Sequence, residues 1–172
     1  MFQLELASKF LAKGFNVINF DDIQFQYNNR IYLIECKRLL SKRNVVHNIN
    51  KAYDQLTQKI TNDNEYGIIA LSIDKLLDID YKYFQKNSEK EILSELEIIS
   101  NSFITNNEKY WDRFNNIHIV CIIIFLKFIS VYQDDIIVSQ LITIKPLPHV
   151  RPHQPIIYSD LKHIAKLLIK NH

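Results

Sequence analysis

The chain has 172 residues, of which 47% are hydrophobic and 23% are charged, and its formal net charge is +2. This length suits one domain that buries its own core without disulfides or a structural metal. The composition is that of a soluble globular protein, and only two glycines and four prolines exclude long flexible linkers.

Neither export nor membrane insertion is indicated. Cys36 and Cys121 both lie in apolar, strand-like runs, which is typical of reduced core cysteines in a cytosolic protein. The N-terminus lacks the basic-then-apolar layout of a signal peptide. The most apolar segment, residues 117–132, is interrupted by Lys127 and falls short of the roughly 20 residues of a membrane helix. We therefore expect a cytoplasmic protein without membrane contact, in which this segment is buried sheet.

The first elements predicted are a helix and three strands. Residues 2–13 place apolar side chains on one helical face, and Gly14 is suited to end that helix. The runs NVINF (16–20), IQFQY (23–27) and RIYLIECK (30–37) then alternate as strands do. Together they predict a β-meander packed by the opening helix.

A strand, helix, strand unit follows. From Asn44 to Ile60 apolar residues recur at helical spacing, and YGIIALSI (66–73) returns to strand. Such a crossover normally joins parallel neighbours in one sheet. The fold class predicted is therefore α/β, with a mixed central β-sheet flanked by helices.

Residues 76–172 are predicted to elaborate this core within a single domain, 1–172, whose core motif region is 1–75. An acidic, mostly helical stretch (74–116) is predicted first, with a clear helix at 88–103 and a shorter one at 107–114. Two strands at 117–132 and 136–145 then pair through Gln133, Asp134 and Asp135. A non-helical, proline-rich stretch (146–155) leads to a basic helix capped by Ser159. Trp111, Tyr110 and Phe114 are interpreted as helix core.

The predicted hairpin gathers charges at one end. If Asn28 and Asn29 form a two-residue turn, antiparallel pairing sets Asp22 opposite Glu35, and directly opposed residues share a face. Lys37 lies two residues after Glu35 and shares that face too. The same register pairs Tyr27 with Arg30, Phe25 with Tyr32 and Ile23 with Ile34. A longer loop would favour Asp21 over Asp22.

Two carboxylates and an ammonium group in this arrangement point to phosphodiester cleavage. Opposed carboxylates repel each other unless a cation lies between them. Their hard oxygens suit Mg²⁺, with Mn²⁺ as a substitute, because Mg²⁺ binds one or two carboxylates, several waters and a phosphate. Lys37 could orient or deprotonate the attacking water, or neutralise charge that develops on the phosphate. The alternative is that Glu35 and Lys37 simply flank a strand end.

The opening helix, the run FDDIQFQYNNRIYLIECKR (20–38) and the helix beginning HNINKAYDQL (47–56) resemble the core of the PD-(D/E)XK nuclease superfamily, which has the restriction-endonuclease-like fold. The resemblance covers about residues 1–75. It implies a role for each matching residue: metal ligation by Asp22, Glu35 and the backbone carbonyl of Cys36, assistance to the water by Lys37, and a polar residue near the site in Gln55.

The sequence departs from that family in three respects. No proline precedes the aspartate, and Asp21 sits beside Asp22. Many relatives place a metal-assisting glutamate on the first helix, where this chain has Gln3. Either that glutamate is absent, or Glu5 reaches the site from a shifted helix. These departures put a second metal ion in doubt more than the first.

Charge is distributed unevenly along the chain. Residues 1–60 carry nine Lys/Arg and five Asp/Glu, residues 61–116 carry six and eleven, and residues 117–172 carry six and three. The basic residues that follow the strand are candidate contacts to a nucleic-acid backbone: Arg38, Lys42, Arg43 and Lys51. Their alternative reading is a solvated loop and helix face.

The sequence therefore predicts a metal-dependent nuclease, and the resemblance implies DNA rather than RNA as substrate and restriction or anti-phage defence as setting. Its partners would be nucleic acid and either a second copy of the chain or other subunits of a defence complex. The rival is a catalytically weak or silent subunit of the same fold that holds nucleic acid in a larger complex. A second rival is an interaction protein that docks a partner through its acidic middle segment.

Overall fold

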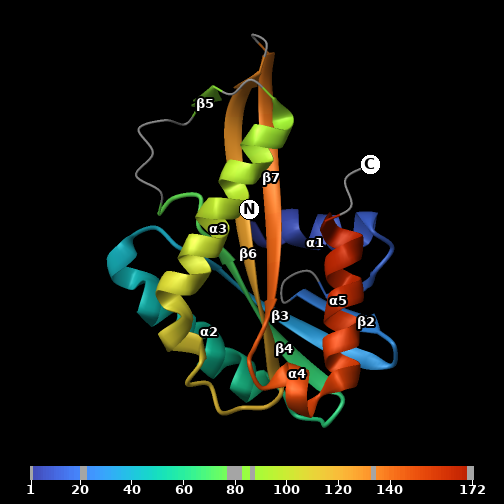
Figure 1. Cartoon of the computed structure of the whole chain (residues 1–172). Helices are drawn as coiled ribbons and strands as arrows, with labels where there is room; N and C mark the ends of the chain where they lie inside the picture. The colour runs from blue at the N-terminus through green and yellow to red at the C-terminus, as the bar shows by residue number, and fades with distance from the viewer. Residues whose placement is uncertain (1, 20–22, 77–82, 86–87, 133–134, 170–172) are drawn as a thin grey trace.

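A computed structural model describes residues 2–19, 23–76, 83–85, 88–132 and 135–169. In this part of the chain a seven-stranded mixed sheet is flanked by helices on both faces (Figure 1). The predicted α/β class and the mixed sheet are thereby confirmed. In chain order the elements are α1 (Phe2–Ala12), β1 (Asn16–Asn19), β2 (Ile23–Tyr27), β3 (Arg30–Arg38), the 3-10 helix η1 (Lys42–Asn44), α2 (Val45–Lys59), β4 (Glu65–Ser72), β5 (Tyr83–Gln85), α3 (Glu89–Trp111), β6 (Ile119–Tyr132), β7 (Asp135–Pro146), α4 (Val150–His153) and α5 (Pro155–Ile169).

Strands β1, β2 and β3 form the predicted antiparallel meander. Asn28 and Asn29 occupy the turn between β2 and β3 with φ of 48° and 62°, the left-handed region that a type I′ hairpin requires. The register is the predicted one, from Tyr27 opposite Arg30 to Ile23 opposite Ile34. Asp21 and Asp22, one step further along, lie outside the described residues.

Helix α2 connects β3 to β4, and these two strands are parallel, as the crossover predicts. Its buried residues are three or four positions apart: Val45, Ile49, Ala52 and Leu56. This spacing lines one face of a helix, and that face packs on β3, β4 and β6.

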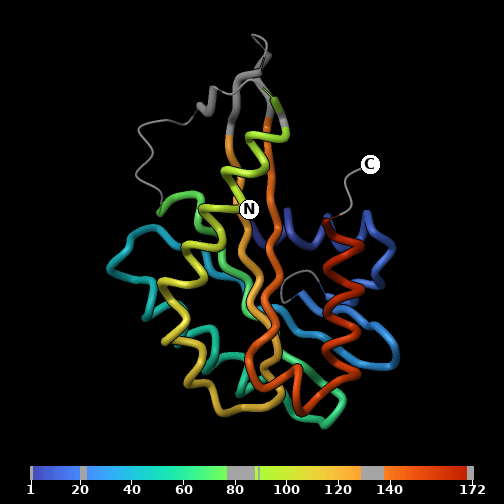
Figure 2. Tube along the Cα trace, in the orientation of Figure 1, coloured from blue at the N-terminus to red at the C-terminus, as the bar shows by residue number. Residues whose placement is uncertain are grey.

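Strand β6 is the axis of the second half of the sheet. β4 pairs in parallel with residues 119–125 and β5 with residues 129–131, while β7 pairs antiparallel from Cys121 to Tyr132. β7 pairs along one edge of β6. β4 and β5 therefore both pair with the other edge of β6, β4 with its first part and β5 with its last part. The β6–β7 hairpin forms the long ribbon at the centre of the molecule (Figure 2). Residues 119–126 are all buried, as predicted for sheet, and none of the described helices has the length and apolar character needed to cross a bilayer.

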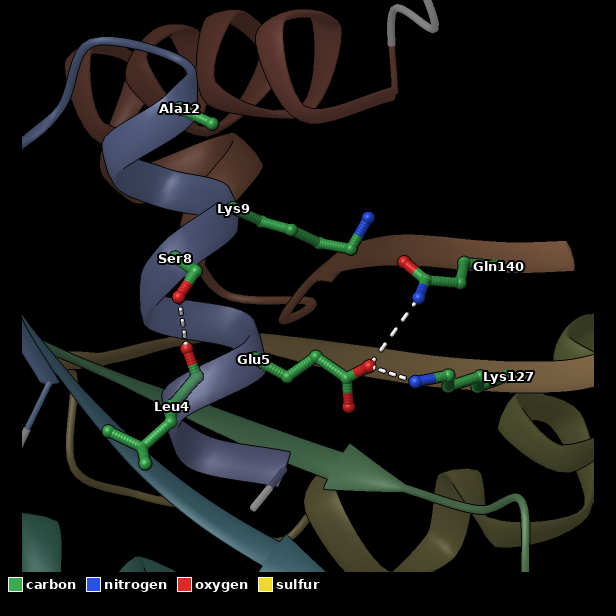
Figure 3. A pocket seen from close by; sticks show the side chains of 7 residues that line it. All are labelled: Leu4, Glu5, Ser8, Lys9, Ala12, Lys127 and Gln140. Atoms are coloured by element: carbon green, nitrogen blue, oxygen red, sulfur yellow. Dashed lines mark hydrogen bonds and ion pairs between the residues drawn. The ribbon is translucent and has the colours of Figure 1, made fainter. Parts of the chain in front are cut away.

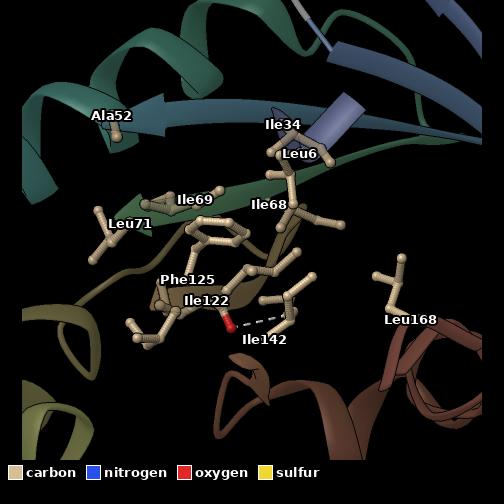
Figure 4. Packing of buried hydrophobic residues seen from close by; sticks show 14 of the residues in the cluster. Leu6, Ile34, Ala52, Ile68, Ile69, Leu71, Ile122, Phe125, Ile142 and Leu168 are labelled. Atoms are coloured by element: carbon tan, nitrogen blue, oxygen red, sulfur yellow. Dashed lines mark hydrogen bonds between the residues drawn. The ribbon is translucent and has the colours of Figure 1, made fainter. Parts of the chain in front are cut away.

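The helices divide between the two faces of the sheet. Glu35 and Lys37 project toward α2, and Ser100 of α3 donates a hydrogen bond to Thr143 of β7 on that same face. The opposite face is covered by α1 and α5. There Leu6 of α1 lies near Ile34 and Ile68 (Figure 4), and the rings of Phe2 and Phe125 are 5.2 Å apart.

Three elements of the second half differ from the prediction. α3 is one helix of 23 residues, not two pieces, and Asn107 lies within it, where its side-chain amide donates to the carbonyl of Phe103. α5 begins at Pro155, four residues before the predicted cap at Ser159, because proline has the right φ for a first helical position. The proline-rich stretch contains the short helix α4, and β5 was not predicted. Trp111, the last residue of α3, is buried, as expected of helix core, whereas Phe114 is buried but lies beyond the end of the helix.

Candidate active site

Strand β3 carries two charged side chains on the face that α2 covers. Glu35 and Lys37 share this face because they are two residues apart on a strand. Glu35 is only 8% exposed, which is unusual for a carboxylate. The burial follows from its place in the sheet, where Glu35 pairs with Ile69 of β4 and α2 lies above it.

Four side chains from β3 and α2 form one hydrogen-bonded cluster. Lys37 Nζ donates to Glu35 Oε1 at 2.7 Å and to Gln55 Oε1 at 2.5 Å. Lys59 Nζ donates to the other carboxylate oxygen, Glu35 Oε2, at 3.0 Å. Glu35 therefore has a lysine on each of its oxygens, and we refer to Glu35, Lys37, Gln55 and Lys59 as the Glu35 cluster.

The pairing explains why the charges can be buried. Removing an isolated ion from water costs several kcal/mol, and opposite charges at hydrogen-bond distance offset that cost. The cluster holds one carboxylate and two ammonium groups, so one positive charge is in excess. The Lys37 side chain is 14% exposed and that of Lys59 is 31% exposed, so the excess charge can be felt by an approaching anion.

The structure brings together three of the predicted site residues, Glu35, Lys37 and Gln55, and adds Lys59. Lys59 follows Gln55 by four positions, which places both on one side of α2. Lys51 precedes Gln55 by four positions and is exposed, so it lies one turn further along the same side. The i, i+4 spacing after Gln55 is a sequence signal that places Lys59 on the same side of α2, but it does not give the contact with Glu35.

Cys36 lies between the two charged residues of β3. Its side chain projects to the opposite face of the sheet, and burial, with the nearby Glu35 carboxylate, raises the pKa of its thiol to about 12. The thiol is thus kept neutral, and the pairing of Cys36 with Ala70 fixes its backbone in the ladder. Cys36 and Cys121 are both free.

Asp21 and Asp22, the other predicted carboxylate ligands, are outside the described residues. Within residues that the structure describes, no group of three His, Cys, Asp or Glu side chains could hold a metal ion. Glu35 is the hard oxygen donor that remains, and a Mg²⁺ ion that keeps several waters needs only one or two carboxylates. Both oxygens of Glu35 accept from lysines in this structure, so such an ion would have to displace one of them.

Glu5 is not brought to Glu35. It lies on α1, on the opposite face of the sheet, where its carboxylate forms an ion pair with Lys127 and accepts a bond from Gln140 Nε2 (Figure 3). These residues line a hollow of about 510 Å³, together with Leu4, Ser8, Lys9 and Ala12. Gln3, half-buried in the first turn of α1, belongs to the same helix. A shifted first helix that delivers a glutamate to the cluster is therefore not what the structure shows.

The predicted basic residues are also separated. Arg38 projects to the face opposite Lys37 and donates to Asp74 Oδ2 at 2.7 Å. Lys42 and Arg43 are exposed in η1, and Lys51 is exposed on α2. Three of the four candidates thus remain on or beside the helix that carries Gln55 and Lys59.

Comparisons of the chain with protein-family models, with curated proteins and with solved structures found no match.

Proposed function

We propose that the protein is a metal-dependent nuclease that hydrolyses phosphodiester bonds at the Glu35 cluster. The observation that carries the proposal is the convergence of a buried glutamate, a lysine two residues later and a glutamine of the next helix. These are the residues that the resemblance to the PD-(D/E)XK nucleases assigns to catalysis. The order helix, three-stranded meander, helix, parallel strand is the context in which that resemblance was drawn.

In this proposal Glu35 would hold a Mg²⁺ ion together with Asp22 and the carbonyl of Cys36, and Mn²⁺ would substitute. A bound Mg²⁺ would polarise the phosphoryl oxygen and offset the charge of the transition state. Lys37 has three N–H donors, of which Glu35 and Gln55 receive two. The third can donate to a phosphate oxygen or orient the attacking water, whose oxygen would bond to phosphorus as the P–O bond to the leaving oxygen breaks. The water would lose a proton to solvent, and the leaving oxygen would take one up.

Gln55 acts as a positioning residue. Its carbonyl oxygen accepts from Lys37, which fixes the direction of the ammonium group relative to Glu35. Lys51, Lys42 and Arg43 would hold the phosphate backbone on the side of α2. DNA as substrate and restriction or anti-phage defence as setting are inferred from the resemblance alone.

A second candidate is a silent subunit that binds nucleic acid within a larger complex. Two observations favour it: both oxygens of Glu35 are held by lysines, and the first helix has Gln3 where many relatives have an acid. A cluster with excess positive charge can bind a phosphate without cutting it.

Cleavage of supercoiled plasmid with Mg²⁺ or Mn²⁺, and with EDTA, decides between these candidates. We compare the wild type with Glu35→Ala and Lys37→Ala, and with Glu97→Ala, an exposed α3 residue, as control. Circular dichroism checks that every variant is folded. We expect metal-dependent nicking that falls by at least about a hundredfold in the two site variants, the usual scale for a lost electrostatic or acid-base group, and that is unchanged in Glu97→Ala.

Cutting that persists in Glu35→Ala and Lys37→Ala would place the activity elsewhere or in a contaminant. Absence of cutting by the wild type, with plasmid still retained on the protein, would favour the silent subunit.

A further inference from the structure

The two lysines that pair with Glu35 differ in their position in the fold and in the exposure of their side chains. Lys37 comes from β3 itself, two residues from Glu35. Lys59 is the last residue of α2, and its side chain is more than twice as exposed as that of Lys37. The position at the helix end and the greater exposure make Lys59 the lysine whose ammonium group can turn from Glu35 toward solvent.

A divalent metal ion would compete with Lys59 for the same oxygen. Mg²⁺ binds a carboxylate oxygen at about 2.0–2.1 Å, whereas Lys59 Nζ lies 3.0 Å from Glu35 Oε2. An ammonium group and a divalent cation on one oxygen would repel each other strongly at this distance. Occupation of Oε2 by the metal thus requires Lys59 to withdraw.

We propose that Lys59 is an exchangeable counter-ion of Glu35, which a divalent metal displaces and which the phosphate backbone of nucleic acid then receives. This regulation rests on the proposed nuclease function. The side of α2 that carries Lys59 also carries Gln55 and the exposed Lys51. A phosphate bound above this side of the helix would attract the ammonium group of Lys59.

The exchange couples the two ligands. Nucleic acid that attracts Lys59 frees Glu35 Oε2 and tightens metal binding, and by thermodynamic linkage the metal tightens nucleic-acid binding by the same factor. Without nucleic acid, Lys59 neutralises the buried carboxylate and keeps metal affinity low. The site would then bind metal firmly only when substrate is present.

The first test measures Mn²⁺ affinity by calorimetry, without nucleic acid and without turnover. Lys59→Met and Lys59→Gln remove the competing charge, and Lys166→Met removes an equal charge from an exposed position on α5. We expect Mn²⁺ to bind Lys59→Met and Lys59→Gln about tenfold more tightly than the wild type, within the usual range of coupling between sites, and Lys166→Met like the wild type. The glutamine variant serves as a second test if the methionine variant does not fold.

The second test measures binding of a short DNA duplex in EDTA by fluorescence anisotropy. Lys59→Met and Lys59→Gln are expected to bind several-fold more weakly than both the wild type and Lys166→Met, because a phosphate partner is lost. Equal duplex affinity of Lys59→Met, Lys59→Gln and the wild type would overturn the transfer of Lys59 to the backbone.

A Glu35→Gln variant separates this inference from the proposed function. If Mn²⁺ binding depends on Glu35 but is the same in the wild type and in both Lys59 variants, the counter-ion inference is overturned and the metal site stands. If Glu35→Gln leaves Mn²⁺ binding unchanged, or if neither the wild type nor the Lys59 variants bind Mn²⁺, the metal site at Glu35 fails and the inference fails with it.

Discussion

A single buried carboxylate with two lysines is the central feature at the scale of residues. Lys37 and Lys59 each hold one oxygen of Glu35, so either lysine alone can still compensate the charge. Loss of both would leave an ion in the protein interior without a partner, which is far more costly than the loss of either hydrogen bond.

We therefore predict non-additive effects on stability. Lys37→Met and Lys59→Met are each expected to lower the free energy of unfolding by roughly 1.5–3 kcal/mol, the scale of a hydrogen bond to a charged group. The double variant should lose about 1 kcal/mol or more beyond the sum of the two, since contacting groups couple. Urea unfolding of the wild type, both single variants and the double variant measures this coupling.

A Glu35→Gln background supplies the control for this cycle. With the carboxylate replaced by a neutral amide, removal of both lysines no longer leaves a buried carboxylate without a partner, so the extra loss in the double variant should disappear. Additivity in the wild-type background as well would show that Glu35 is not the group that couples them.

Sequence reasoning found part of this cluster. The pattern E-x-K in a strand identifies Glu35 and Lys37, and a glutamine on the next helix suggests Gln55, because strand periodicity and chain order suffice for both. Lys59 was missed because helical spacing from Gln55 says which side of α2 it is on but not which carboxylate oxygen it reaches. That information comes only from the distance between α2 and β3, which is a tertiary property.

At the scale of elements, α5 is tied to the β2–β3 hairpin by one buried carboxylate. Asp160 of α5 is 4% exposed. Its Oδ1 accepts from Asn28 Nδ2 at 2.9 Å, and its Oδ2 accepts from Arg30 at 2.9 Å and from the Tyr32 hydroxyl at 2.8 Å. Burial, together with the bond to Asp160, raises the pKa of Tyr32, so this phenol remains a donor throughout the ordinary pH range. Three donors of one hairpin therefore converge on one helix residue.

We predict that Asp160→Ala lowers the free energy of unfolding by about 3 kcal/mol, the lower end of the range for removing one partner of a buried charged network. Arg30 and Tyr32 would lose their common acceptor. Ser159→Ala, at the neighbouring exposed position of α5, is expected to change stability by less than about 0.5 kcal/mol. Denaturant unfolding of both variants gives the comparison, and equal stabilities would show that the hairpin does not depend on this helix.

The predicted elements of the first half agree with the structure more closely than those of the second. The turn at Asn28–Asn29 and the spacing of α2 are determined by local chemistry, so the register and the crossover follow from sequence. β5 has only three residues and pairs with residues 129–131 of β6, which are distant in sequence. A strand this short has no local sequence pattern that predicts it. The late start predicted for α5 was wrong because proline can occupy the first position of a helix.

At the scale of the whole molecule, the two halves of the chain share one core. β4 of the first half pairs with β6 of the second, and α5 packs against the opening hairpin. The buried hydrophobic residues form a single cluster that runs from Phe2 to Leu168. Length and the absence of linkers led us to expect one domain. Because the core is shared, neither half can unfold without exposing apolar surface of the other.

We therefore predict that the protein unfolds in a single cooperative transition. Trp111, the only tryptophan, is 1% exposed in α3 and reports on the second half, whereas far-UV circular dichroism reports on all helices and strands. If the halves are one cooperative unit, both signals should give the same midpoint in urea. Asp160→Ala provides the sharpest comparison, because it weakens a contact between the halves: both signals should move together to lower urea. A fluorescence transition separated from the dichroism transition, in the wild type or in this variant, would show that α3 and its surroundings form a separate unit.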